Sequence, residues 1–141
     1  MVKPSIYLSF DGQCEAAFRF YERCLGGTIT SLLAWGDSPM AKDAAPEWGA
    51  KILHASLSVG DVVLAGADTQ RYERPRGFSV MLGLRDRIEA ERIFTALAED
   101  GTVTVPLQET FWAVRYGWVT DRFGIPWTIN CGEEPTSSGP G

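Results

Sequence analysis

The most regular feature of the chain is a pair of short segments in which polar and apolar residues alternate. Residues 5–10 alternate in this way, and residues 79–84 repeat the pattern. An alternation of period two predicts a β-strand with one apolar face. After each segment, apolar residues recur at helical spacing, over residues 14–25 and 90–98, which predicts two amphipathic helices. Each predicted strand therefore offers one face to a helix and leaves its other face free.

The second half of the chain repeats the first. When Glu15 is aligned with Glu89, six of sixteen positions are identical, and Gly27 falls on Gly101. The same alignment brings the two alternating segments onto each other, which chance does not explain. The sequence therefore predicts one structural motif used twice.

Turn and cap signals complete the motif. Asp86 predicts the start of the second helix, because its carboxylate can accept from an unpaired amide of the first turn. Gly26-Gly27 is expected to close the first helix and Gly101 the second, in the left-handed conformation that glycine tolerates. Gly60-Asp61 predicts a two-residue hairpin turn of the primed type, and the unit becomes β-α-β-β-β. The strands expected after the helices are residues 28–33, 52–59 and 62–66 in the first half, and 102–107, 114–120 and 126–131 in the second.

The length of 141 residues fits one domain, which we place at residues 1–132. Residues 36–48 form a long loop rich in Asp, Pro and Ala, which suits a lid or a dimer contact. Residues 133–141 have the Ser, Pro and Gly content of a flexible tail. Within the domain, the expected parts are module one at about residues 4–67, a polar linker at 68–77 and module two at about 78–132.

Composition and charge exclude several classes of function. Thirteen Lys and Arg against eighteen Asp and Glu give a net charge of −5, which opposes binding to nucleic acid. No run approaches the length of a membrane span and no signal peptide is recognisable, so we expect a cytoplasmic protein without a membrane partner. Cys14, Cys24 and Cys131 are odd in number and far apart, which indicates buried small hydrophobic residues rather than disulfides or a zinc ribbon.

Characteristic motifs follow one another along the chain. The first half carries YLSFDG at residues 7–12, EAAFRFY at 15–21 and ILHA at 52–55. The second half carries the long run YGWVTDRFGIPWTIN at 116–130. Together these motifs resemble the PhnB-like branch of the vicinal oxygen chelate superfamily, which contains glyoxalase I, bleomycin-resistance proteins and extradiol dioxygenases. The resemblance covers about residues 5–131.

The resemblance implies an α+β fold in which two tandem βαβββ modules form a curved, barrel-like mixed sheet. The helices would lie outside, and a ligand cavity would lie on the concave side between the modules. Strand alternation then assigns the polar strand positions to the cavity wall. The expected ligand-binding residues are Tyr7, Ser9, Trp35, His54, Ser79, Met81, Trp112, Tyr116, Trp118 and Thr128.

Metal-dependent relatives in the superfamily carry His or Glu at the start of the first strand of each module and near the end of its last strand. In this chain those positions correspond, within about one residue, to Ser5, Leu64, Ser79 and Thr128. None of these is a usual metal ligand, and the chain has a single His. We therefore expect neither a metal site nor a cofactor.

Two sets of side chains leave alternatives open. His54 suits a general base, because its ordinary pKa lies near neutrality, but it also suits a hydrogen-bonded residue of the pocket wall. The aromatic residues at loop or strand ends suit either a rim that stacks on a flat ligand or a dimer contact. They are Trp35, Trp48, Phe111 and Trp112. No glycine-rich nucleotide loop is present, which argues against a methyltransferase.

The leading hypothesis is a metal-free homodimer that binds a small, partly aromatic organic molecule in the cavity. The alternative is an enzyme of the lyase or dioxygenase type, in which His54 belongs to a non-standard metal site. A third hypothesis is a protein with a vestigial cavity whose role is assembly. The sequence does not identify the ligand, because loop positions determine the shape of a pocket.

Overall fold

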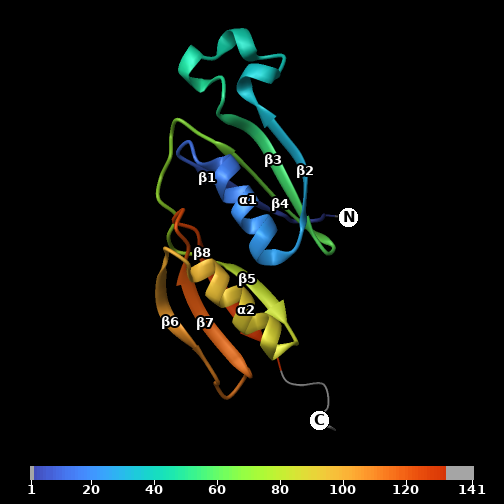
Figure 1. Ribbon diagram of the computed structural model, residues 1–141, viewed down its shortest axis with the longest axis vertical. Helices are drawn as coiled ribbons and strands as arrows, with labels where there is room; N and C mark the ends of the chain where they lie inside the picture. The colour runs from blue at the N-terminus through green and yellow to red at the C-terminus, as the bar shows by residue number, and fades with distance from the viewer. Residues whose placement is uncertain (1, 133–141) are drawn as a thin grey trace. The chain divides into compact units, whose positions relative to one another are not determined.

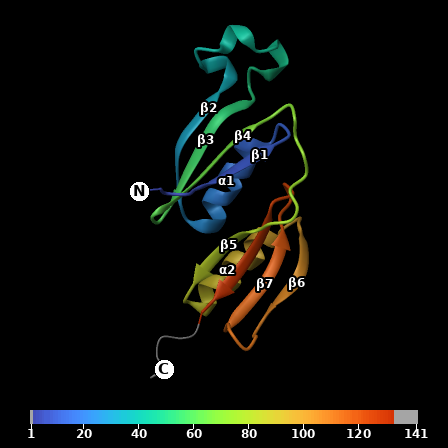
Figure 2. The ribbon, with the colours of Figure 1, turned by 180° about the vertical axis from the view of Figure 1, so that it is seen from behind.

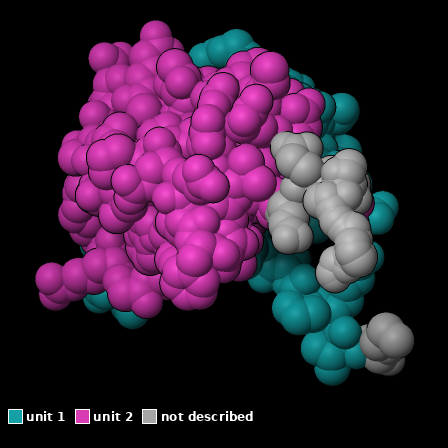
Figure 3. Space-filling view, turned by 90° about the horizontal axis from the view of Figure 1, so that it is seen from below, with its two compact units in different colours: residues 1–73 teal, residues 74–141 magenta. Residues whose placement is uncertain are grey.

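The chain folds into two compact units, residues 1–73 and 74–141 (Figure 3), and this computed structural model describes residues 2–132 of them. Each unit runs strand, helix, strand, strand, strand, which confirms the predicted tandem βαβββ modules. Each has its own open, four-stranded mixed sheet with one helix against one face (Figures 1 and 2). The predicted flexible tail lies outside the described residues.

In the first unit the strand order is β1-β4-β3-β2, with β1 and β4 parallel and the other pairs antiparallel. Gly60 has a φ of 58°, as the first position of a primed hairpin turn between β3 and β4 requires. The elements are β1 (Ile6–Phe10), α1 (Cys14–Leu25), β2 (Thr28–Ala34), three short 3₁₀ turns, β3 (Ile52–Val59) and β4 (Val62–Asp68). The 3₁₀ turns η1 (Trp35–Asp37), η2 (Ala41–Asp43) and η3 (Pro46–Trp48) occupy the expected long loop.

Aromatic rings fill the space between α1 and its sheet. The Phe18 ring meets Phe10 edge to face with 6.1 Å between ring centroids, and it meets Tyr21 at 6.0 Å. The helix approaches closely because β4 carries Gly66 at this point, where an added Cβ would lie 2.9 Å from the Phe18 ring. The aromatic packing therefore depends on a glycine in the facing strand.

A buried carboxylate joins the ends of three elements in the first unit. Asp68, at the end of β4, accepts a hydrogen bond of 2.9 Å from the amide of Cys14 and one of 2.8 Å from the amide of Ile52. These bonds satisfy the first amide of α1 and the first amide of β3. Gln13 precedes the helix and provides no side-chain cap, so Asp68 supplies from a distance what a local cap would supply.

In the second unit the strand order is β5-β8-β7-β6, with β5 and β8 parallel. Asp86 caps α2, and its carboxylate accepts from the amide of Ile88 at 3.0 Å, as predicted. Neither helix in the described part of the chain is long and apolar enough to cross a membrane. The elements are β5 (Val80–Leu84), α2 (Arg87–Ala98), β6 (Thr102–Gln108), β7 (Arg115–Thr120) and β8 (Pro126–Cys131).

Asp121 organises the turn between β7 and β8. It is 3% exposed, and it accepts from the amides of Phe123 and Ile125 and from the indole nitrogen of Trp127. Trp127 is fully buried on the helix side of the sheet, as its place in the alternation predicts. The buried carboxylate thus holds both the turn and the largest core side chain.

The expected role of Gly101 is wrong. After α2 the left-handed residue is Asp100, with a φ of 60°, whereas Gly26 takes this role after α1 with a φ of 77°. Gly101 is needed for a different reason, because an added Cβ would lie 2.4 Å from the carbonyl oxygen of Thr120. Gly27 meets the carbonyl oxygen of Ser58 at the same distance. The repeated glycines therefore serve the close approach of two strands, in the same way in both units.

Candidate functional site

Three aromatic side chains line the face of the second sheet that α2 does not cover. Along β7, Gly117 and Val119 are buried toward the helix, and Tyr116 and Trp118 alternate onto the open face. The indole nitrogen of Trp118 donates to the Tyr116 hydroxyl at 2.7 Å. The Trp112 ring packs against Tyr116 with 5.1 Å between centroids and an angle of 73°. We call Trp112, Tyr116 and Trp118 the aromatic wall; their hydrogen bond and ring contact hold it in place.

Small polar groups lie beside the aromatic wall. Thr128 of β8 is paired in register with Met81 of β5 on one side and with Trp118 of β7 on the other. The Thr128 hydroxyl lies 2.6 Å from the hydroxyl of Ser79, just before β5. Met81 is 62% exposed on the same open face. The predicted residues of the second unit therefore come together on one face of the sheet, where Thr128 is 3% exposed beneath its neighbours.

A residue that the sequence analysis missed completes this surface. Asn130 lies two positions after Thr128 in β8, so its side chain shares the open face, and it is paired in register with Gly83 and Tyr116. Its side-chain oxygen is buried and accepts no hydrogen bond from the described residues. A buried acceptor without a donor is unfavourable by about 1–3 kcal/mol. The alternation through Thr128 contained the signal that would have found Asn130.

The open face of the first sheet is mostly small and polar. Tyr7 is 61% exposed there, and its register partner Ala65 is paired in turn with Ser56 of β3. The Ser56 hydroxyl lies 2.8 Å from the hydroxyl of Thr30. The expected site residues Ser9 and His54 are exposed in β1 and β3 of this unit, and His54 is paired with Leu33.

Trp35 lies in the 3₁₀ turn η1 and not in a strand of the sheet. It follows β2 and lines a cavity formed by the 3₁₀ turns and the end of β4. Phe111 and Trp48 also differ in their surroundings. Phe111 is 97% exposed beside Trp112, whereas Trp48 is half-buried and lines the same cavity as Trp35.

The residues at the superfamily's metal positions do not fit a transition metal. Leu64 is 4% exposed in the core, and the hydroxyls of Ser79 and Thr128 bond to each other. Within residues 2–132, no three His, Cys, Asp or Glu side chains converge to hold an ion. Neutral hydroxyls alone compete poorly with water for such ions. No chemical step is therefore assigned to a metal.

Cys14, Cys24 and Cys131 are buried and form no disulfide in the described part of the chain, as expected for small core residues. Burial raises the pKa of the Cys14 thiol far above its ordinary value, and the nearby carboxylates of Asp68 and Glu15 act in the same direction. A thiol that stays protonated is a poor nucleophile and a poor metal ligand. Cys14 therefore belongs to the core and to no reactive site.

Tandem βαβββ modules, each with an open sheet face, are the defining architecture of the vicinal oxygen chelate superfamily. The chain belongs to the PhnB-like family of this superfamily, which is described as 3-demethylubiquinone-9 3-methyltransferase and matches residues 2–130. That description applies to the family. The described residues of this chain form two mixed four-stranded sheets and contain no doubly wound nucleotide-binding sheet.

Individual relatives agree with this assignment. Protein YjdN of Escherichia coli K12 is 35% identical over 136 residues, which cover 89% of this chain and 92% of YjdN. The crystal structure of protein PA1353 from Pseudomonas aeruginosa is 42% identical, with a TM-score of 0.87, and the match covers 95% of this chain and 100% of that one. A putative 3-demethylubiquinone-9 3-methyltransferase, PhnB protein, from Bacillus cereus shares the fold at 21% identity, with a TM-score of 0.78 over 93% of this chain and 100% of that one.

Proposed function

We propose that this protein binds a small, partly aromatic organic molecule without a metal, on the open face of its second sheet. The observation that carries the proposal is the buried, unpaired side-chain oxygen of Asn130 next to the aromatic wall. A ligand that donates an N–H or O–H to this oxygen would remove an unfavourable buried acceptor. The wall supplies flat surfaces for the aromatic part of the same ligand.

The polar groups of this face favour binding over nucleophilic catalysis. The Ser79 hydroxyl is bonded to the Thr128 hydroxyl rather than to a base, and Ser56 in the first unit is likewise bonded to Thr30. A serine becomes a nucleophile when an adjacent base takes its proton, and another hydroxyl cannot do this at neutral pH. The hydroxyl pairs instead suit hydrogen bonds that orient a ligand.

The open face of the first unit forms the second part of the proposal. Tyr7, Ser9 and His54 are exposed on its strands, and we propose them as further ligand contacts. Tyr7 contributes an aromatic surface, and His54 contributes ring nitrogens for hydrogen bonds. Together the proposed contacts are Tyr7, Ser9, His54, Ser79, Met81, Trp112, Tyr116, Trp118 and Thr128, with Asn130 added from the structure.

A thermal-shift screen of small aromatic compounds, in buffer containing EDTA, tests this proposal. A hit should bind at least fivefold more weakly to Trp118→Ala, because loss of a buried aromatic contact at a binding site commonly weakens affinity by about that factor or more. Ile88→Ala is the matched control, since Ile88 is a 69% exposed apolar residue on α2. Equal affinity of folded Trp118→Ala and Tyr7→Ala for every hit would refute the assignment of the site to the open faces. Elemental analysis showing about one transition metal per chain, lost in His54→Ala, would refute the metal-free part.

We also propose that the protein is a twofold homodimer in the cytoplasm. Phe111 and Trp112 are exposed aromatic residues, and β1, β2, β5 and β6 are edge strands of their own sheets, which association commonly covers. Three cysteines that form no disulfide in the described residues suit a reducing compartment. Light scattering at micromolar concentration should give twice the mass of the chain; a monomer would contradict the dimer.

A further inference from the structure

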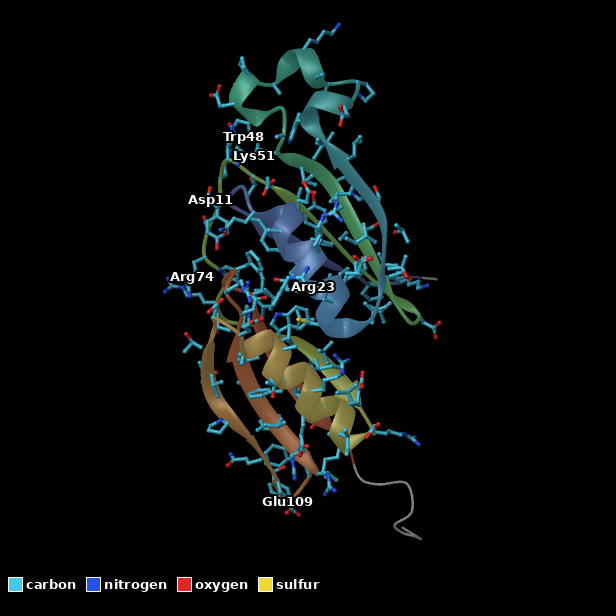
Figure 4. All side chains as sticks on the ribbon, viewed as in Figure 1. Asp11, Arg23, Trp48, Lys51, Arg74 and Glu109 are labelled. Atoms are coloured by element: carbon cyan, nitrogen blue, oxygen red, sulfur yellow. The ribbon has the colours of Figure 1, made fainter. Side chains whose placement is uncertain are left out.

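The first unit contains a cavity of about 400 Å³ between the 3₁₀ turns and the end of β4. This volume is within the range of small-molecule pockets. Trp48, labelled in Figure 4, lies where the turns rejoin the strands. The cavity is lined by Trp35, Asp43, Ala44, Ala45, Trp48, Asp68, Thr69, Gln70 and Arg71.

The segment of 3₁₀ turns that lines the cavity, residues 35–51, is held by hydrogen bonds between its two ends. The amides of Trp35 and Gly36 donate to the carbonyl oxygens of Lys51 and Gly49, each at 2.9 Å. Inside the segment, the buried hydroxyl of Ser38 donates to the carbonyl oxygen of Trp35 at 2.8 Å. The walls are thus held before any ligand arrives, which reduces the entropy lost on binding.

Trp35 brings an unused donor to this cavity. Its indole nitrogen is buried and finds no acceptor among the described residues, although its ring lines the cavity. Indole N–H groups usually find a partner when they are buried. A ligand acceptor beside the ring would satisfy this N–H.

The cavity is lined by side chains of both charges. The Arg71 guanidinium makes no ion pair with the described residues, and its segment is held by a bond from the Arg71 amide to the Thr69 hydroxyl. Asp43 contributes a carboxylate, and both oxygens of Asp68 already accept backbone amides. A strongly charged ligand would meet one favourable and one unfavourable group, so a neutral ligand fits best.

We propose that this cavity is a second binding site, for a neutral planar heteroaromatic molecule that carries a carbonyl beside an N–H. The carbonyl accepts from the Trp35 indole and from Arg71, the N–H donates to Asp43, and the ring stacks on Trp48. The proposal uses no residue of the open faces, so it stands or falls independently of the proposed function.

The probe for the test is 2-quinolinone, a neutral bicyclic lactam, titrated into ¹⁵N-labelled protein. The indole N–H signals, assigned by single Trp→Phe variants, should shift for Trp35 and Trp48. Trp35→Phe keeps an aromatic ring but removes the donor, and it should bind about fivefold more weakly, in the range expected for one hydrogen bond. Ile88→Ala, an exposed substitution on α2 outside both proposed sites, is the control and should bind with the affinity of the unchanged protein.

A second variant separates loss of the site from a folding defect. Ala45 is exposed at the cavity, so Ala45→Leu should fill the space, abolish the shifts of Trp35 and Trp48 and leave the remaining spectrum unchanged. Naphthalene-2-carboxylate, which is charged and lacks the lactam, should bind at least fivefold more weakly than 2-quinolinone. The proposal is overturned if millimolar 2-quinolinone leaves the Trp35 signal in place, or if folded Trp35→Phe and Ala45→Leu bind as tightly as the unchanged protein.

Discussion

The two units share the same backbone arrangement and differ in the side chains on their open faces. Gly27 and Gly101 permit the same close approach of two strands in both units. On the open faces, the first unit presents the hydroxyls of Ser56 and Thr30, whereas the second presents the aromatic wall with Asn130. The repeat therefore preserves what the fold needs, and the proposed binding site lies where the two units differ.

The units also differ in how their helices begin. Asp86 caps α2 from the position just before the helix, whereas Asp68 holds the first amide of α1 from the far end of β4. The carboxylate of Asp68 additionally holds β3, so one side chain supports three elements. The first unit thus depends on a single remote residue where the second uses a local one.

The largest loss of stability should come from removing the carboxylate of Asp68. Asp68→Ala leaves two buried amides without a charged acceptor and should lower the free energy of unfolding by about 4 kcal/mol. Asp86→Ala, the matched control in the other unit, should cost about 1 kcal/mol. Urea denaturation measures both. Equal losses in the two variants would show that Asp68 is an ordinary cap.

Because the two units use equivalent glycines at the close approach of two strands, substituting either glycine should lower stability by a similar amount. Gly27→Ala and Gly101→Ala should each cost about 3 kcal/mol, because the new Cβ would overlap a backbone carbonyl that cannot move freely. Gly83→Ala is the control, since an added Cβ at Gly83 meets nothing within 4 Å. A large loss for only one of the two repeated glycines would break the equivalence of the units.

The buried thiol of the first unit predicts a dependence on pH. The folded state keeps the Cys14 proton because its pKa is raised, whereas the unfolded thiol loses its proton above about pH 8.5. Stability is therefore fully present below that pH and falls as pH rises, by about 2 kcal/mol at pH 10. The free energy of unfolding, measured with urea under reducing conditions at pH 7 and pH 10, should fall by about 2 kcal/mol less in Cys14→Ala than in the unchanged protein. An equal fall in both proteins would contradict the assignment.

The smallest effect concerns the aromatic wall. Tyr116→Phe removes the acceptor of the Trp118 indole and should lower the free energy of unfolding by about 1 kcal/mol. A double-mutant cycle with Trp118→Phe isolates the pair, and the coupling should be of similar size. Strictly additive losses would show that this hydrogen bond does not hold the wall.

Periodicity and turn signals predicted much of the fold. The alternation in residues 5–10 and 79–84 placed the strands to within one residue, and Asp86 began α2 as expected. Gly101 was misread because its role depends on Thr120, a neighbour in space that no local pattern reveals. Asp68 escaped notice for the same reason, since its partners lie at the starts of α1 and β3.

The candidate site could be predicted only in part. Alternation placed Tyr116, Trp118 and Thr128 on one face, because each strand position fixes the direction of its side chain. Asn130 follows the same rule but becomes informative only through its unpaired oxygen, which depends on its surroundings. Trp35 follows a strand rather than lying within one, so the sequence could not show that it lines a separate cavity.

The most direct test of the proposed function follows the indole N–H signals of all five tryptophans during titration with a ligand from the screen, with EDTA present throughout. We expect the signals of Trp118 and Trp112 to shift in step with binding, while that of Trp127, fully buried under α2, stays in place. A ligand that saturates the protein without moving the Trp118 and Trp112 signals would contradict the account. So would shifts that appear only after a transition metal is added in excess of EDTA.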